Sequence, residues 1–316
     1  MTMISRRGFL GSSAIVAGAA IFAPRSVFAQ EGQQPELMLF ARKIASTAKI
    51  TTQKLRGGMY ALLGTAGNIA VLPGPQGKLL VDSGMATAQP QIVEALTAIS
   101  ADKLSHLINT HWHYDHTDGN SWMHEAGAII IAQEKCKARL SSTQTIKAFN
   151  ATFPPVSKGA LPTKTFGEKY QIKLNGMTIS MAHYESAHTD TDISIHFVEA
   201  DVLHVGDTWL NGFYPFIDYS SGGNINGMIK AADRTLATAG ADTIIIPGHG
   251  PVGNKKQLQE FRDVLAFARD TVAVLKQQGK TLDEVVAAKP TEKYDATWGA
   301  GFMKTDMFLG FVYQGV

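Results

Sequence analysis

Short apolar runs separated by turn residues dominate the first part of the chain after about residue 50. Four such runs cover residues 50–55, 59–63, 69–73 and 78–81, with glycine or proline between successive runs. Runs of this length with these boundaries are typical of β-strands joined by tight turns. The pattern therefore predicts a β-rich region at the start of the fold.

From Thr87 the apolar spacing changes to that of a helix. Four apolar residues recur three or four positions apart, on one helical face: Ile92, Ala95, Leu96 and Ile99. A strand, a polar loop, a helix and a buried strand should follow, with the regular elements at 106–109, 117–125 and 128–132. Residues 150–165 contain three prolines and are expected to form a long surface loop.

The second half repeats this order of strands followed by helices. We expect strands at 170–174, 177–182, 192–197 and 202–205. A helix at 224–239, a strand at 243–246 and a long amphipathic helix at 255–277 should follow. Two β-rich halves that each end in βα units can stack as two mixed sheets with helices outside. The predicted fold is therefore α/β, a four-layer αββα sandwich over residues 48–316, after a linker at 30–47.

The N-terminus has the features of an export signal. Arg6-Arg7 precedes Gly8-Phe9-Leu10, a Gly/Ala-rich apolar stretch follows, and a small residue, Ala29, precedes a plausible cleavage point. The apolar stretch is too short and too rich in glycine for a membrane span. Residues 1–29 are thus predicted to be a twin-arginine signal peptide. We expect export by the twin-arginine machinery, a periplasmic or secreted location and no stable membrane anchor.

The composition excludes some classes of site and argues against one class of partner. The single cysteine, Cys136, excludes an internal disulfide and a cysteine-rich zinc site. Removal of residues 1–29 takes away three arginines and no acid, which changes the formal net charge from +2 to −1. The sequence also lacks a basic stripe or a nucleic-acid-binding motif, so nucleic acid is not an expected partner.

The main chemical signal is Thr110-His111-Trp112-His113-Tyr114-Asp115-His116, directly after a predicted strand. On extended backbone alternate side chains share one face, so His111 and His113 can reach one metal ion. Asp115 and His116 lie where the chain turns into a helix and can reach a second ion nearby. Imidazole and carboxylate ligands suit Zn²⁺.

Three more candidate ligands lie further along the chain, each at the end of a predicted strand. His188 is in a loop between two strands, Asp207 follows the strand at 202–205, and His249 follows the strand at 243–246. Loops at strand ends commonly carry functional residues on a rigid scaffold. These residues complete a set of five histidines and two aspartates.

The motif and its distant partners resemble those of the metallo-β-lactamase superfamily, over about residues 59–262, and Asp82 in Leu-Val-Asp-Ser-Gly matches the family's first motif. The resemblance implies a αββα sandwich that holds two Zn²⁺ per chain. It assigns the first ion to His111, His113 and His188. It assigns the second to Asp115, His116 and His249, with Asp207 bridging both and Asp82 orienting a ligand.

The resemblance also implies catalysis by a metal-bound hydroxide, which Asp115 and Asp207 help to hold in place. The expected function is an exported zinc hydrolase that opens a small carbonyl substrate: a β-lactam, a lactone or an ester. Asp207 argues against a standard zinc β-lactamase, whose families usually have Cys or Ser at this position. A glyoxalase-II-like thioesterase, a phosphodiesterase and a non-catalytic binding protein with the same fold are the alternatives.

Aromatic residues near the motifs could form apolar walls of a substrate pocket. The candidates are Trp112, Tyr114, Trp209 and Tyr214, with Phe213 and Phe216 beside them. Such walls would suit a small cyclic amide, lactone or ester.

Overall fold

The computed structural model describes residues 35–316 and shows two β-sheets packed face to face. The first sheet has the strand order β1-β2-β3-β4-β5-β6-β9. Its strands are β1 (Thr51–Lys54), β2 (Tyr60–Leu63), β3 (Ile69–Leu72), β4 (Lys78–Val81), β5 (Leu104–Ile108), β6 (Ile129–Gln133) and β9 (Lys164–Phe166). The strands from β1 to β4 pair antiparallel, and β4, β5, β6 and β9 pair parallel.

The second sheet has the order β10-β11-β12-β13-β14-β15. Its strands are β10 (Lys169–Leu174), β11 (Met177–His183), β12 (Ile193–Phe197), β13 (Val202–His204), β14 (Ile244–Ile246) and β15 (Gly253–Asn254). Only β13 and β14 pair parallel, because helix α7 (Ile225–Thr238) connects them. A separate hairpin consists of β7 (Gln144–Ile146) and β8 (Ala151–Phe153).

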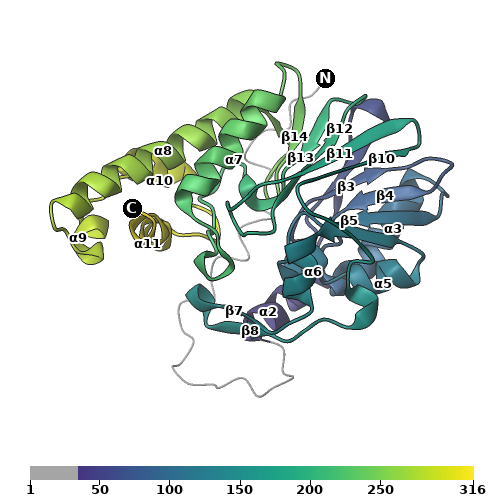
Figure 1. The fold of residues 1–316 in the computed structure, drawn as a ribbon, viewed down its shortest axis with the longest axis horizontal. Coiled ribbons are helices and arrows are strands. Elements are labelled where there is room, and N and C mark those ends of the chain that lie inside the picture. The colour runs from purple at the N-terminus through teal and green to yellow at the C-terminus, as the bar shows by residue number, and fades with distance from the viewer. Residues whose placement is uncertain (1–34) are drawn as a thin grey trace.

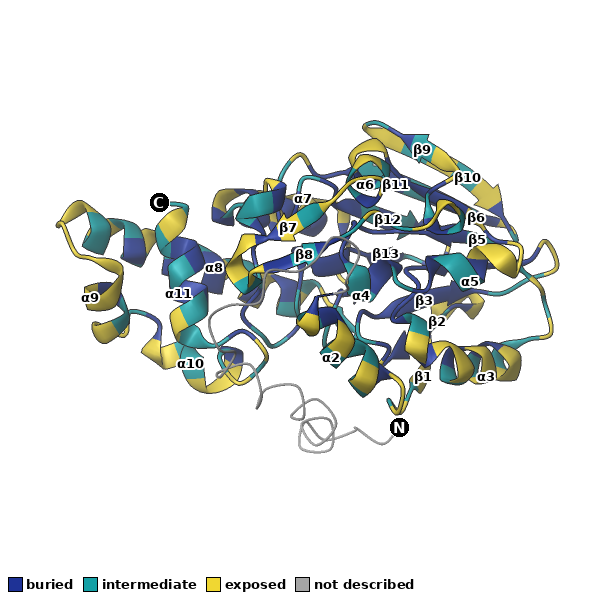
Figure 2. Ribbon diagram, turned by 90° about the horizontal axis from the view of Figure 1, so that it is seen from below, coloured by how far each residue is buried: buried dark blue, intermediate teal, exposed yellow. Residues whose placement is uncertain are grey.

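Alternating side chains divide the core into layers. Leu79 and Val81 of β4 face Ile195 and Phe197 of β12 between the sheets, whereas Leu80 points to the outer face of the first sheet. That outer face is covered by α3 (Gln89–Ile99) and α5 (Asn120–Glu125). The outer face of the second sheet is covered by α7 and α8 (Lys255–Gln277). The arrangement is the predicted αββα sandwich, with buried strands between more exposed helices (Figures 1 and 2).

The remaining helices lie at the ends of the sandwich. They are α2 (Glu36–Ala45), α4 (Tyr114–Thr117), α6 (Glu134–Leu140), α9 (Leu282–Ala287), α10 (Glu292–Trp298) and α11 (Thr305–Gln314). Figure 1 shows α9 and α11 grouped at the C-terminal end of α8. Among residues 35–316, no helix combines the length and the apolar character that a membrane crossing requires.

Two segments differ from the sequence-based expectation. The described part of the predicted linker contains α2, which buries Met38 and Ala45 and whose Arg42 pairs with Asp118. The predicted loop at 150–165 contains β8 and the first residues of β9. Both strands are three residues long, β8 in a short local hairpin and β9 beside the distant β6, so their local sequence carries little signal. The predicted signal peptide lies outside the described residues.

Candidate metal centre

The loops that follow several strands place the seven candidate ligands at one edge of the sandwich. His111 and His113 follow β5, and Asp115 and His116 lie in α4. The other three lie between β11 and β12, after β13 and after β14: His188, Asp207 and His249. Five of the seven are buried, and only Asp115 and His249 are partly exposed. The approach from solvent is therefore on the side of Asp115 and His249.

The seven side chains form three overlapping groups of potential ligands. The groups are His111–His113–His188, His111–His116–Asp207 and Asp115–His116–His249, and within each group the ligand atoms lie within 4.8 Å of one another. Asp207 lies between the first and third groups. One of its oxygens is 3.1 Å from His116 Nε2, and the other is 3.4 Å from His249 Nε2 and 3.6 Å from His188 Nε2.

Hydrogen bonds on the outer side of the centre determine which ring nitrogens point inward. His188 Nδ1 lies 2.8 Å from the carbonyl oxygen of Phe216, and His113 Nε2 lies 3.1 Å from Asp218 Oδ2. These oxygens only accept, so the two outer nitrogens must donate. The inner nitrogens, His188 Nε2 and His113 Nδ1, then both present lone pairs when the rings are neutral, although they lie 2.8 Å apart. A shared cation would remove this repulsion.

His111 follows the same logic through Thr110. The Thr110 hydroxyl donates its only proton to Asp82 Oδ2 at 2.8 Å, so it must accept a hydrogen bond from His111 Nδ1 at 2.9 Å. His111 Nε2 therefore carries a lone pair, and it is buried without a hydrogen-bond partner. Three inward lone pairs in one buried group fit a metal ion better than any pattern of protons.

The charges of the centre support this interpretation. Burial lowers the pKa of His111 and His113, which keeps both rings neutral and able to bind a metal. In the group Asp115–His116–His249, burial alone would lower the pKa of His249, but the carboxylate of Asp207 raises it to about 10. Protons on His116 and His249 thus offset the clustered carboxylates, a role that a divalent cation can take over on release of those protons.

A family comparison agrees with this geometry. Residues 63–249 match the model of the metallo-beta-lactamase superfamily. The chain belongs to this superfamily. The match covers more than half of the chain and contains all seven candidate ligands. Members of the superfamily are usually hydrolases.

Individual relatives are more distant. The chain is 26% identical over 172 residues to a hydroxyacylglutathione hydrolase from Polaromonas sp., with 54% of this chain and 57% of the relative covered. It therefore spans little more than half of that protein's length.

Solved structures show the same fold. The inverting sec-alkylsulfatase Pisa1 from Pseudomonas sp. has a TM-score of 0.63 and 16% identity, covering 84% of this chain and 50% of its own. A metallo-beta-lactamase from Pontibacter korlensis has a TM-score of 0.55 and 15% identity, covering 69% of this chain and 99% of its own.

Two aspartates form hydrogen bonds with candidate ligands through the ring nitrogens that point away from the centre. Asp82 accepts hydrogen bonds from His116 Nδ1 at 2.7 Å and from the Thr110 backbone at 2.7 Å. It adopts a left-handed backbone conformation with φ 65°. Asp218, which the sequence analysis missed, holds His113 in the same way. Sequence offered no signal for this pair because 105 positions separate the two residues.

The aromatic residues proposed as pocket walls divide into two groups. Trp209 and Tyr214 are fully buried in the core formed with α7, α8 and α11, so their prediction as pocket walls is wrong. The ring of Tyr214 stacks on Phe308 instead. Trp112 is buried beside His113, whereas Tyr114 is partly exposed and stacks on Phe153. Phe216 contacts the rings of His113 and His188 directly.

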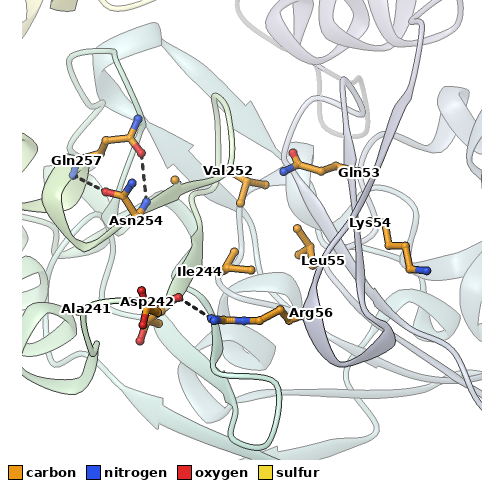
Figure 3. A pocket seen from close by; sticks show the side chains of 12 residues that line it. Gln53, Lys54, Leu55, Arg56, Ala241, Asp242, Ile244, Val252, Asn254 and Gln257 are labelled. Carbon is orange, nitrogen blue, oxygen red and sulfur yellow. Dashed lines mark hydrogen bonds between the residues drawn. The ribbon is translucent and has the colours of Figure 1, made fainter. Parts of the chain in front are cut away.

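A cavity of about 760 Å³ lies away from the metal centre, between β1 and the β14–β15 pair (Figure 3). Arg56 crosses its floor and donates to the carbonyl oxygen of Asp242, and Asn254 and Gln257 bond to each other at the start of α8. None of the seven candidate ligands lines this cavity. We assign no function to this cavity.

Proposed function

We propose that this superfamily member is a binuclear zinc hydrolase of a small carbonyl substrate. In this proposal His111 Nε2, His113 Nδ1 and His188 Nε2 hold the first ion. Asp115, His116 Nε2 and His249 Nε2 would hold the second, and Asp207 would contribute to both. The observation that carries the proposal is the group of inward lone pairs at His111, His113 and His188. Zinc bound there would polarise a substrate carbonyl and lower the pKa of a water to about 7.

The residues around the ions have separate tasks. Asp82 and Asp218 fix the rotation of His116 and His113, which prepares the centre before substrate binds. Asp115 and His249 lie on the partly exposed side, where substrate and water enter. Asp115 Oδ2 lies 3.1 Å from His249 Nε2, so the carboxylate is placed to orient an entering water. Phe216 packs on His113 and His188 of the first group.

A β-lactam, a lactone or an ester is the proposed substrate class. The decisive experiment combines metal analysis with a hydrolysis panel on the zinc-loaded chain. We expect about two zinc ions per chain, loss of activity on chelation and its recovery on zinc addition. The panel contains a chromogenic cephalosporin, acyl-homoserine lactones, aryl esters, a thioester and a phosphodiester. Full turnover by metal-free protein would reject the proposal.

A thioesterase is the second candidate, and the similarity to a hydroxyacylglutathione hydrolase favours it. The thioester in the panel separates the two candidates. An alanine at His116 distinguishes an enzyme from a binding protein, because only turnover requires the complete centre.

We further propose that residues 1–29 direct export by the twin-arginine route. Arg6-Arg7 and the following apolar stretch support this proposal. Replacement of both arginines by lysine should retain the protein in the cytoplasm, as measured by fractionation. Unchanged export of the variant would reject this route.

A further inference from the structure

Three phenylalanine rings form a continuous path from the metal centre to the surface. Phe216 stacks on His113 at a centroid distance of 5.8 Å and meets His188 edge-on at 5.6 Å. Phe149 lies 4.9 Å from Phe216, and Phe302 lies 5.7 Å from Phe149. Phe149 and Phe216 are half-buried, whereas Phe302 is 39% exposed. The path therefore begins at the imidazoles and ends in solvent.

The three rings come from segments far apart in the chain. Phe216 is in the loop after Asp207, Phe149 is near the tip of the β7–β8 hairpin, and Phe302 is in the loop between α10 and α11. The last segment lies beyond residues 63–249, which match the superfamily. The C-terminal helices thus add a surface to the centre that the matched region does not supply.

Hydrogen bonds and close packing fix the C-terminal loop against the loop that carries Phe216. The Tyr214 hydroxyl donates to Asp295 Oδ1 at 2.7 Å, and the Tyr214 backbone donates to the carbonyl oxygen of Trp298 at 2.8 Å. Gly301 packs on the ring of Phe213 so closely that a Cβ atom would lie 3.0 Å from Phe213 Cγ. The position of Phe302 relative to Phe216 is therefore set before any ligand binds.

The other side of the hairpin also reaches the centre. Phe153 of β8 stacks on Tyr114 at 5.1 Å, next to Asp115 on the solvent side. The hairpin thus contacts Tyr114 through Phe153 and Phe216 through Phe149. Phe153 is buried, so Phe149 is the phenylalanine of the hairpin that offers apolar surface.

We propose that Phe149, Phe216 and Phe302 bind the apolar chain of the substrate, which makes the substrate an ester or lactone with a medium-length acyl or aryl group. This inference rests on the proposed function. The rings offer an apolar surface that starts at two candidate ligands, His113 and His188, and ends at the exposed Phe302. Each methylene group buried on such a surface contributes up to about fourfold in affinity. Chain length should therefore control specificity.

The test uses the zinc-loaded chain and p-nitrophenyl esters from acetate to decanoate. For the wild type we expect kcat/KM to rise about 10- to 100-fold from acetate to octanoate. Phe302→Ala should raise KM for octanoate about 10-fold. Phe302→Leu should restore most of the loss, because it restores apolar area. Phe302 is partly exposed, so its truncation leaves the core intact.

Phe267→Ala is the matched control, because Phe267 is half-buried on α8 and packs on Tyr294, away from the three rings. It should retain the wild-type dependence on chain length. If Phe302→Ala also retains that dependence, or the wild type shows none, the inference is wrong while the proposed hydrolase stands.

A second measurement tests the inference in case the proposed hydrolase activity is not found. If no ester in the series is hydrolysed, calorimetry with decanoate and acetate decides the inference, because both carboxylates share the same head group. We expect decanoate to bind the wild type at least 10-fold more tightly than acetate, and Phe302→Ala to lose most of this difference. Equal affinities for the two carboxylates in the wild type would overturn the inference.

Discussion

Replacement of Asp218 by asparagine tests whether this carboxylate prepares the first group for zinc. Both oxygens of Asp218 accept hydrogen bonds: Oδ2 from His113 and Ser221, and Oδ1 from the backbone and hydroxyl of Ser220. Burial alone would raise its pKa, but the bond from His113 and the serine hydroxyls hold that pKa below its usual value. The group is thus an anion with every acceptor in use.

An asparagine has one oxygen, so its NH₂ must face either His113 or Ser220. If it faces His113, the imidazole shifts its proton to Nδ1, the nitrogen that should bind zinc. If it faces Ser220, His113 still loses a charged partner. Loss of such an outer partner costs about 10- to 100-fold in metal affinity. This corresponds to about 1.4–2.8 kcal/mol at 25 °C.

The assay is competition for zinc against a chelator, with kcat/KM measured on the same samples. Cobalt substitution gives a second signal, because the visible spectrum of Co²⁺ reports the ligands of the first ion. Asp201→Asn is the control, since Asp201 is partly exposed and pairs with Arg56 far from the centre. Asp218→Asn with wild-type zinc affinity and a wild-type cobalt spectrum would refute the orienting role.

Three further predictions address other parts of the account. Gly67→Ala should lower kcat/KM more than 10-fold, because the new Cβ would lie 2.5 Å from His116 Cε1. The control Gly167→Ala should have no effect, because the space around its Cβ position is open. Equal activities of the two variants would contradict this packing argument. Chelation of zinc should lower Tm by about 5–10 °C, because ligand at 100 times Kd stabilises the fold by about 2.7 kcal/mol; an unchanged Tm would argue against a metal bound to the folded state. Burial raises the pKa of Asp192 from 3.8 to about 7, so its stabilising contribution is complete below about pH 4 and is lost as the pH rises to about 7. Thermal unfolding of metal-free Asp192→Asn should lack this slope, and a profile parallel to that of the wild type would contradict it.

The sequence predicted most of the fold because most elements carry a local signal. Helix α8 begins and ends where we expected, since Asn254 and Gln257 form a capping box and the apolar face is continuous. Helix α2 was not predicted from the sequence, because it buries only Met38 and Ala45 and has no side-chain cap. Strands β8 and β9 were not predicted because each has only three residues, and β9 is defined by its pairing with the distant β6.

The candidate ligands could be found from sequence because histidine and aspartate at strand ends are conspicuous. The direction of a side chain is harder to predict. Trp209 lies only two positions after Asp207, yet it points into the core. The contacts of His113 with Asp218 and of Phe216 with Phe149 and Phe302 join segments that only the folded chain brings together. Such pairs have no local pattern.

The most direct test of the central claim is an anomalous difference map, collected at the zinc edge from crystals of the zinc-loaded chain. We predict two peaks a few ångströms apart. One should contact His111, His113 and His188, and the other should contact Asp115, His116 and His249. An empty centre, or zinc bound only at other residues, would contradict the account.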